Sequence, residues 1–109
     1  MTRLDVIQMI GDLITEIDIA RGSLMPDDPE RHTLDDQRIL LDDRQRKLSQ
    51  SLFNDNSEAF QEAARKLAKI NEEISGTIKS VENIVTTIAN IQRFLEAATS
   101  LIKVVGSFA

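Results

Sequence analysis

The residues of this chain that are best suited to chemistry are aspartates in its first half. Adjacent aspartates stand at 27/28, 35/36 and 42/43, and carboxylate oxygens are the ligands that hard cations prefer. Neighbouring side chains on a helix point about 100° apart, so no adjacent pair can hold a cation as a unit. Residues seven apart share a helix face, and this spacing predicts an acidic face formed by Asp35, Asp36, Asp42 and Asp43. The chain has neither a calcium-loop spacing nor the Glu-x-x-His pair of di-iron bundles, and we expect no bound metal.

Catalytic residue types are scarce in the rest of the chain. His32 is the single histidine, in a polar stretch after Pro29 that is typical of a solvated helix start, and the chain has no cysteine. The absence of cysteine excludes disulfides, thiolate catalysis and cysteine metal sites. The sequence also lacks a glycine-rich phosphate loop and a nucleophile elbow. We therefore expect a protein that is not an enzyme and that has no catalytic residue, no cofactor and no small-molecule substrate.

Charge is distributed unevenly along the chain. Residues 1–56 contain 7 Lys or Arg against 12 Asp or Glu, whereas residues 57–109 contain 6 of each, so the net charge of −5 lies in the first half. The main basic cluster is Arg44, Arg46 and Lys47, which directly follows two aspartates and has no aromatic neighbour for stacking. We therefore expect no nucleic acid partner. Opposite charges four residues apart predict ion pairs along a helix surface: Arg31 with Asp35, Asp42 with Arg46, and Asp43 with Lys47.

The elements that must carry these residues are helices, because apolar residues recur in the second half at a helical period. Two stripes repeat at intervals of seven: Leu67, Ile74, Val81, Ile88, Leu95 and Ile102 in the first, and Ile70, Thr77, Ile84, Ile91, Ala98 and Val105 in the second. Such an a/d pattern is that of a coiled coil and specifies a helix that buries one seam against other helices. We expect the centre of the core or of an association surface at Leu67, Ile70, Ile74, Val81, Ile84, Ile88, Ile91, Leu95 and Ile102.

Composition favours one all-α domain over residues 1–109. The chain has 4 Gly, 2 Pro and neither Tyr nor Trp, whereas sandwiches and barrels need turn residues and aromatic or β-branched strands. Its length suits one modest core. Apolar spacing predicts a helix over residues 3–21, closed by Gly22 in the left-handed conformation. A linker with a possible helix start follows over residues 22–33, and a second helix spans residues 34–53.

The starts of the later helices are predicted from candidate capping residues. For the second helix two predictions stay open: Asp28 can cap a helix with Pro29 in its first position, or Thr33 can cap one with Asp36 three residues later. Asp55 is the predicted cap of a third helix that begins near residue 57.

The segment 57–105 is either one helix or two. An unbroken helix would be about 74 Å long, which a globule of this size cannot cover, so part of its seam would be left for a second chain. The sequence Ser75-Gly76-Thr77 is the candidate break, but glycine inside a helix costs only about 1 kcal/mol and the heptad phase continues past it. We therefore expect a bundle of two shorter N-terminal helices and a long heptad-patterned C-terminal helix. The alternative is an up-down four-helix bundle broken near Gly76.

Helix-mediated association is the function that the seam favours. We expect a non-enzymatic helical interaction protein that forms a homo-oligomer or docks a protein partner through the C-terminal seam. One alternative is a small acidic inhibitor, of the immunity-protein or antitoxin type, whose aspartates bind a basic partner. Another is a membrane-active or secretion-associated helical subunit. The sequence shows neither a signal peptide nor a transmembrane segment, so we expect a cytoplasmic protein; non-classical export and membrane binding stay open as alternatives.

Overall fold

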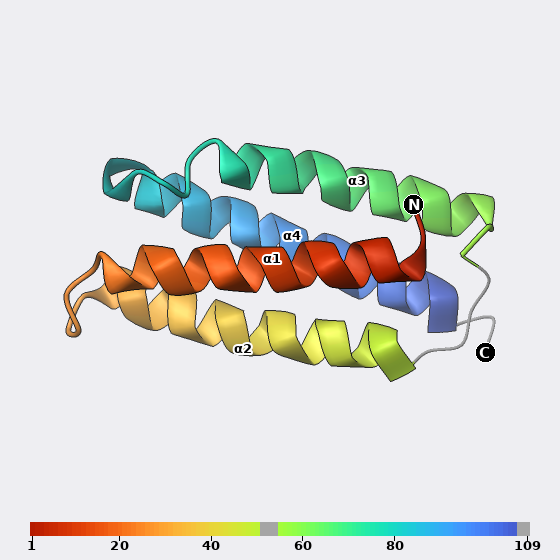
Figure 1. Ribbon diagram of the computed structural model, residues 1–109, viewed down its shortest axis with the longest axis horizontal. Helices are drawn as coiled ribbons and strands as arrows, with labels where there is room; N and C mark the ends of the chain where they lie inside the picture. Colours follow the sequence, from red (N-terminus) through yellow and green to blue (C-terminus); the bar gives the residue numbers. More distant parts are fainter. Residues whose placement is uncertain (51–54, 107–109) are drawn as a thin grey trace.

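The computed structural model describes residues 1–50 and 55–106, and within these ranges it contains four α-helices and no strand (Figure 1). The helices are α1 (Arg3–Gly22), α2 (Pro29–Gln50), α3 (Glu58–Ser75) and α4 (Ile84–Gly106), and a 3₁₀ turn, η1 (Val81–Asn83), leads into α4. The all-α prediction is confirmed. The predicted end of the second helix at residue 53 lies outside the described residues, as does the side chain of Val105.

α1 starts with a capping box that ties its first turn together. The Thr2 hydroxyl accepts a hydrogen bond from the Asp5 N–H at 3.2 Å, and the Asp5 carboxylate accepts one from the Thr2 N–H at 2.8 Å. Two donors that a helix start leaves free are thus satisfied. The expected left-handed cap at Gly22 is wrong, since Gly22 is still helical and no described glycine has a positive φ. Instead, the Ser23 N–H donates to the Ala20 carbonyl at 3.1 Å. This bond spans three residues, as in a 3₁₀ helix, and Ser23 keeps right-handed dihedral angles.

α2 starts at Pro29, as the first of the two predictions has it, and not at residue 34. The Arg31 and His32 N–H groups bond to the Asp28 carbonyl at 3.1 and 3.3 Å. Proline suits this first position because its missing N–H would have no partner within the helix. Thr33, the other candidate cap, lies inside α2 and donates its hydroxyl to the Pro29 carbonyl at 3.1 Å.

α3 is capped by Ser57, whose hydroxyl accepts a hydrogen bond from the Phe60 N–H at 3.2 Å. The predicted cap, Asp55, is therefore wrong. Its carboxylate instead accepts a hydrogen bond from the Arg3 N–H at 3.0 Å, so it satisfies a free donor at the start of α1. The capping signal depends on residues that are close in sequence. The Asp55 carboxylate is instead bonded to α1, which lies beside it in space but far from it in sequence.

α3 and α4 are separate helices, so the preferred prediction of one long helix over residues 57–105 is wrong and its alternative, a break near Gly76, holds. α3 ends at Ser75, and Gly76 keeps right-handed values of φ −73° and ψ −18°. The chain turns further on, at Ser80, which is extended with φ −113° and ψ 119°. Ile78, between these residues, is buried in the core. Burial of apolar side chains within one chain, and not the freedom of glycine, therefore accounts for the break.

A hydrogen bond between two threonine hydroxyls joins the connection between α3 and α4 to α4 itself. Thr87 is fully buried and donates its hydroxyl to Thr77 Oγ1 at 2.7 Å, and Thr77 donates to the Ile74 carbonyl at 3.3 Å. Thr77 occupies one position of the predicted apolar stripe, where a hydroxyl needs a partner once it is buried. The reversal of the chain supplies that partner from α4.

The helices form two antiparallel pairs (Figure 1). α1 packs along α2, and α3 packs along α4; the two pairs meet mainly where α2 lies against α4, and more sparsely between α1 and α3. The turn between α1 and α2, at residues 23–28, and the turn between α3 and α4, at residues 76–83, lie at the same end of the molecule. The start of α1 and the end of α4 lie at the other end.

The predicted seam lies mostly inside the core that these helices enclose. Its buried members are Leu67, Ile70, Ile74, Ile84, Ile91 and Leu95. Ile88 and Ile102 are partly buried and pack against them. Val81 is instead 50% exposed, because it lies in η1 after the reversal of the chain, where the heptad register no longer applies. α1 and α2 complete the core with Val6, Ile10, Leu13, Ile17, Leu34, Leu41 and Leu48.

Candidate functional site

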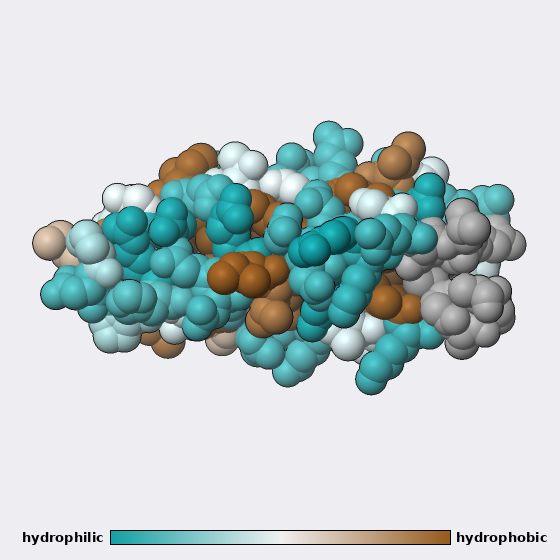
Figure 2. Space-filling model, turned by 90° about the horizontal axis from the view of Figure 1, so that it is seen from below, coloured by the Kyte–Doolittle hydropathy of each residue, from teal (hydrophilic) through white to brown (hydrophobic). Residues whose placement is uncertain are grey.

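The four aspartates of the predicted acidic face lie on α2, and cations of the same chain engage three of them. Asp35 binds Arg21 of α1 at 2.5 Å, and not Arg31 as the spacing predicted. Asp42 pairs with Arg46 at 3.6 Å, and Asp36 is exposed. α2 as a whole has five acidic and five basic residues, so this helix carries no excess of negative charge. On the α2 side of the molecule, Figure 2 shows a mainly hydrophilic surface with separate hydrophobic areas.

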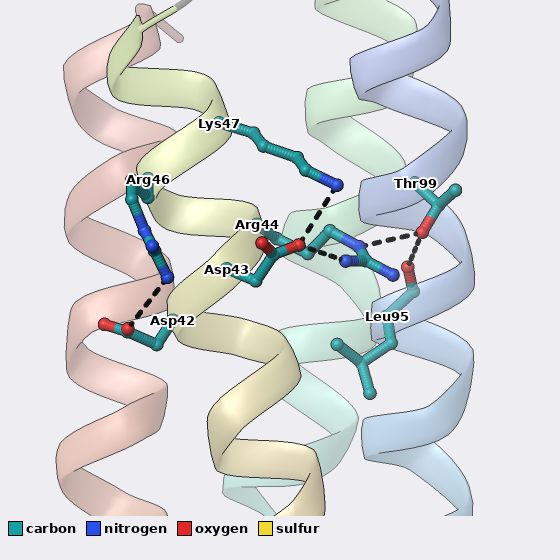
Figure 3. A network of polar contacts seen from close by, with 7 residues as sticks. All are labelled: Asp42, Asp43, Arg44, Arg46, Lys47, Leu95 and Thr99. Carbon is teal, nitrogen blue, oxygen red and sulfur yellow. Dashed lines mark hydrogen bonds and ion pairs between the residues drawn. The ribbon is translucent and has the colours of Figure 1, made fainter.

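Asp43 belongs to a network that joins α2 to α4 (Figure 3). Its carboxylate accepts a hydrogen bond from Arg44 at 2.6 Å and is 3.1 Å from the Lys47 ammonium. Arg44, whose side chain is only 20% exposed, also donates from Nε to Thr99 Oγ1 at 3.0 Å. Thr99 in turn donates to the Leu95 carbonyl at 2.9 Å. The predicted basic cluster therefore contributes to packing between helices through Arg44.

Hydrogen bonds from cations keep two of these aspartates ionised. The Arg21 guanidinium holds the pKa of Asp35 below its ordinary value of 3.8. Lys47, and after it Arg44, lowers the pKa of Asp43 in the same way. A carboxylate that is stabilised as an anion by fixed donors is a poor proton acceptor at neutral pH. The geometry of these residues thus fits ion pairing, between α1 and α2 for Asp35 and within α2 for Asp43, better than acid–base chemistry.

Two glutamines of α2 donate hydrogen bonds to backbone carbonyls of neighbouring helices, and neither was predicted from the sequence. Gln37, which is 4% exposed, donates from Nε2 to the Ile88 carbonyl of α4 at 3.0 Å. Gln45 donates to the Ile7 carbonyl of α1 at 3.1 Å. A signal existed for Gln37, because it stands three residues after Leu34 and four before Leu41, on the apolar stripe of α2.

An apolar pocket lies at the end of the molecule that holds the two turns. Its walls come from α1 and from the connection between α3 and α4, and its volume is about 130 Å³. α1 contributes Glu16, Ile19 and Ala20, the residue after it contributes Ser23, and the connection with the start of α4 contributes Ile78, Lys79, Val81 and Ile84.

The lining residues divide into a buried floor and an exposed rim. Ala20, Ile78 and Ile84 are buried, whereas Ile19 is 70% and Val81 50% exposed. An engineered cavity of about 150 Å³ accommodates a molecule as large as benzene, so this pocket has room for the end of one large side chain. Two apolar side chains beside such an opening form a surface that a docked partner would remove from water.

Glu16 is the polar residue that distinguishes this pocket. Its Oε2 atom is buried and has no hydrogen-bond partner among the residues that the structure describes. Buried carboxylate oxygens are normally paired, because their desolvation is otherwise uncompensated. This oxygen has almost no accessible surface, so a group placed in the pocket cannot reach it, and the walls that an occupant would meet are mainly apolar.

The sequence identified only part of this site. Val81 and Ile84 belong to the predicted seam, but Glu16 and Ile19 come from the first helix, about sixty residues away. Ile19 carried a weak signal, because it is a large apolar residue that lies off the buried face of its helix. No pattern in the sequence indicated that Glu16 and Ile19 lie next to residues 78–84.

Comparisons with protein-family models, with curated proteins and with solved structures find no match to this chain. In the described part of the chain, none of the helices combines the length and the hydropathy that crossing a bilayer requires. Any functional conclusion therefore rests on the residues and the geometry given above.

Proposed function

We propose that this chain is a non-enzymatic helical interaction protein that docks a protein partner at the pocket between α1 and the α3–α4 connection. The observation that carries the proposal is the exposure of Ile19 and Val81 beside an opening with an apolar floor. Single exposed apolar residues are common on protein surfaces. A pair that borders a pocket is typical of the places where an anchor residue of a partner is buried.

The heptad seam has a different part in this proposal from the one expected from the sequence. Its central residues, such as Ile74 and Ile91, are fully buried against helices of the same chain. Docking through the seam would require the helix pairs to separate and expose this core. We therefore assign the seam to support of the site: Ile84, one of its members, forms part of the pocket floor.

The acidic-inhibitor hypothesis has less support as a description of the whole surface. The aspartates on which it relied lie on α2, where Arg21, Arg46 and Lys47 engage them. An ion pair within the chain weakens the field that would attract a basic partner. A cytoplasmic location, expected from the sequence, remains part of the proposal.

The test compares two variants that carry the same change at equally exposed positions. Ile19→Gln alters the rim of the pocket, and Ile39→Gln alters α2, where Ile39 is 65% exposed and Ile19 is 70% exposed. Both variants should keep the helix content and melting curve of the original protein. Tagged proteins would be used to capture partners, and each captured partner would then be titrated with the purified variants.

The expected result is a partner whose affinity falls about tenfold with Ile19→Gln and stays unchanged with Ile39→Gln. Equal binding by both variants would reject the pocket as the docking site. Light scattering over a range of concentrations identifies self-association: a dimer that Ile19→Gln dissociates would make a second copy of the chain the partner.

A further inference from the structure

The core-facing seam of α2 alternates between leucine and a long polar side chain. Leu34, Leu41 and Leu48 repeat at intervals of seven and are fully buried. Gln37 and Arg44 stand between them, at the other position of the same a/d pattern. Leucine packs against any apolar stripe, whereas a polar residue in such a seam specifies one pairing at a cost in stability.

Both polar residues of the seam bond to α4. Gln37 donates from Nε2 to the Ile88 carbonyl at 3.0 Å, and Arg44 donates from Nε to Thr99 Oγ1 at 3.0 Å. The Gln37 amide is not fully satisfied, because its Oε1 atom is buried and has no hydrogen-bond partner among the described residues. An apolar side chain of the same size would avoid the desolvation of that oxygen. The core thus contains an amide that costs stability where α2 contacts one particular helix.

The helix that α2 contacts is not the next one in the sequence. In the described part of the chain α2 packs against α1 and α4, and α3 packs against α4 and more sparsely against α1, so α2 and α3 lie diagonally across the core (Figure 1). α3 also has a buried apolar stripe, formed by Leu67, Ile70 and Ile74. A bundle with α2 beside α3 would bury the leucines of α2 as well. The leucines therefore do not decide between α3 and α4.

Gln37 would lose its contact in an arrangement with α2 beside α3. Its acceptor, Ile88, follows Thr87 in the sequence, and Thr87 bonds to Thr77, which lies beyond the end of α3 at Ser75. At the height of Gln37 along the bundle, α3 therefore has no helical turn to offer. The amide would lose the helix carbonyl to which it donates in α4.

Arg44 would lose its contact in the same arrangement. Its acceptor, Thr99, precedes Ser100, which lines a surface pocket together with Lys66 of α3. The residues of α3 at the height of Arg44 are therefore those near Lys66. Residues 64–69 comprise two Ala, one Leu, one Arg and two Lys, so their side chains offer donors and no acceptor.

We infer that Gln37 and Arg44 select α4, in place of α3, as the helix that packs beside α2. This inference is independent of the proposed docking site. The leucines of the seam supply burial, and the two polar side chains decide which helix receives it. Removal of both polar groups should leave a helical bundle that no longer has a single arrangement.

The experiment reads which helix lies beside α2. The chain has no cysteine, so Leu40→Cys can carry a single nitroxide at a position that is 41% exposed and lies between Gln37 and Arg44. The nitroxide broadens the amide signals of ¹⁵N-labelled protein, and its effect falls steeply with distance. With no other change, we expect stronger broadening in α4 than in α3.

Two test variants and one matched control would carry this label. Gln37→Met keeps the length of the side chain and removes the amide, and Gln37→Met/Arg44→Met removes both bonds to α4. Gln45→Met is the control, because Gln45 also donates from α2 to a backbone carbonyl, but to that of Ile7 in α1. We expect each bond removed to raise the population with α2 beside α3 about fivefold. The double variant should therefore show a second set of amide signals, broadened in α3, and Gln45→Met should not.

Three results would overturn the inference. The first is a single set of signals in the double variant with α4 still the more broadened helix, which would assign the choice to other features, such as the similar lengths of α2 and α4, 22 and 23 residues. The second is an additional set of signals in Gln45→Met as well. The third is broadening in a mixture of spin-labelled ¹⁴N protein with unlabelled ¹⁵N protein, because the contact would then come from a second copy. Melting curves serve as the folding control, and Gln37→Met should not melt at a lower temperature than the original protein, since its amide has an unpaired oxygen.

Discussion

The hydroxyl pair between Thr77 and Thr87 allows a direct test of the turn between α3 and α4. The two Oγ1 atoms lie 2.7 Å apart and Thr87 is fully buried. The perturbation is replacement by valine at each position and at both, because valine keeps the branched shape and removes the hydroxyl. A double-mutant cycle over the four proteins isolates the energy of the contact itself.

The expected magnitudes follow from the geometry. Thr87→Val removes one buried hydrogen bond and leaves the Thr77 hydroxyl bonded to Ile74, which should cost about 1 kcal/mol in free energy of unfolding. Thr77→Val leaves the buried Thr87 hydroxyl without its acceptor and should cost about 1–2 kcal/mol. Because both changes remove the same bond, the double variant should lose about 1 kcal/mol less than the sum of the two.

One continuous helix gives a different result. Residues 77 and 87 would then lie about 15 Å apart along the helix axis, and their effects would add within about 0.5 kcal/mol. Urea unfolding followed by far-ultraviolet circular dichroism measures the four free energies. Light scattering on the same samples is needed, since two continuous helices could bring Thr77 next to Thr87 of a second copy. Additive effects, or coupling found only in a dimer, would refute the assignment of the turn.

Three other outcomes are expected. Gly76→Ala should raise the free energy of unfolding by about 0.5–1 kcal/mol, since Gly76 has right-handed φ and an added methyl meets only ordinary contacts; a lower urea midpoint would contradict this. Ile91→Ala should lower the same free energy by about 2–5 kcal/mol, because Ile91 is fully buried, and a loss under about 1 kcal/mol would place it outside the core. Hydrogen bonds hold the pKa values of Asp5, Asp35 and Asp43 below the ordinary 3.8, so their stabilisation is complete above that value and is lost as the pH falls through the lower folded-state values. Urea midpoints recorded at decreasing pH should therefore begin to fall near about pH 4, and midpoints that stay constant into strong acid would refute the pairing.

The extent of α1 and two of the three predicted ion pairs within α2 could be predicted because they depend on residues close in sequence. The expected range 3–21 differs by one residue from Arg3–Gly22. The pairs of Asp42 with Arg46 and of Asp43 with Lys47 lie one helical turn apart and form as predicted. Helical periodicity fixes both results without knowledge of the remaining fold.

The turn between α3 and α4 could not be predicted for a physical reason. The heptad phase continues across it, and Gly76 keeps helical dihedral angles, so neither feature separates one helix from two. The choice depends on what the seam packs against, namely α2 and the remainder of the same chain. The same holds for Asp35, whose partner Arg21 arrives from another helix, and for the pocket, which joins Glu16 to residues 78–84.

The pairing of consecutive helices also bears on how the chain reaches its structure. α1 with α2, and α3 with α4, are joined by short turns, so their contacts close small loops and we expect them to form early in folding. The α2–α4 interface joins the two halves of the chain, and we expect it to form after both pairs. Gln37 and Arg44 lie on that interface, bonded to α4. We expect these two side chains to be fixed last, when each half is already a folded helical hairpin.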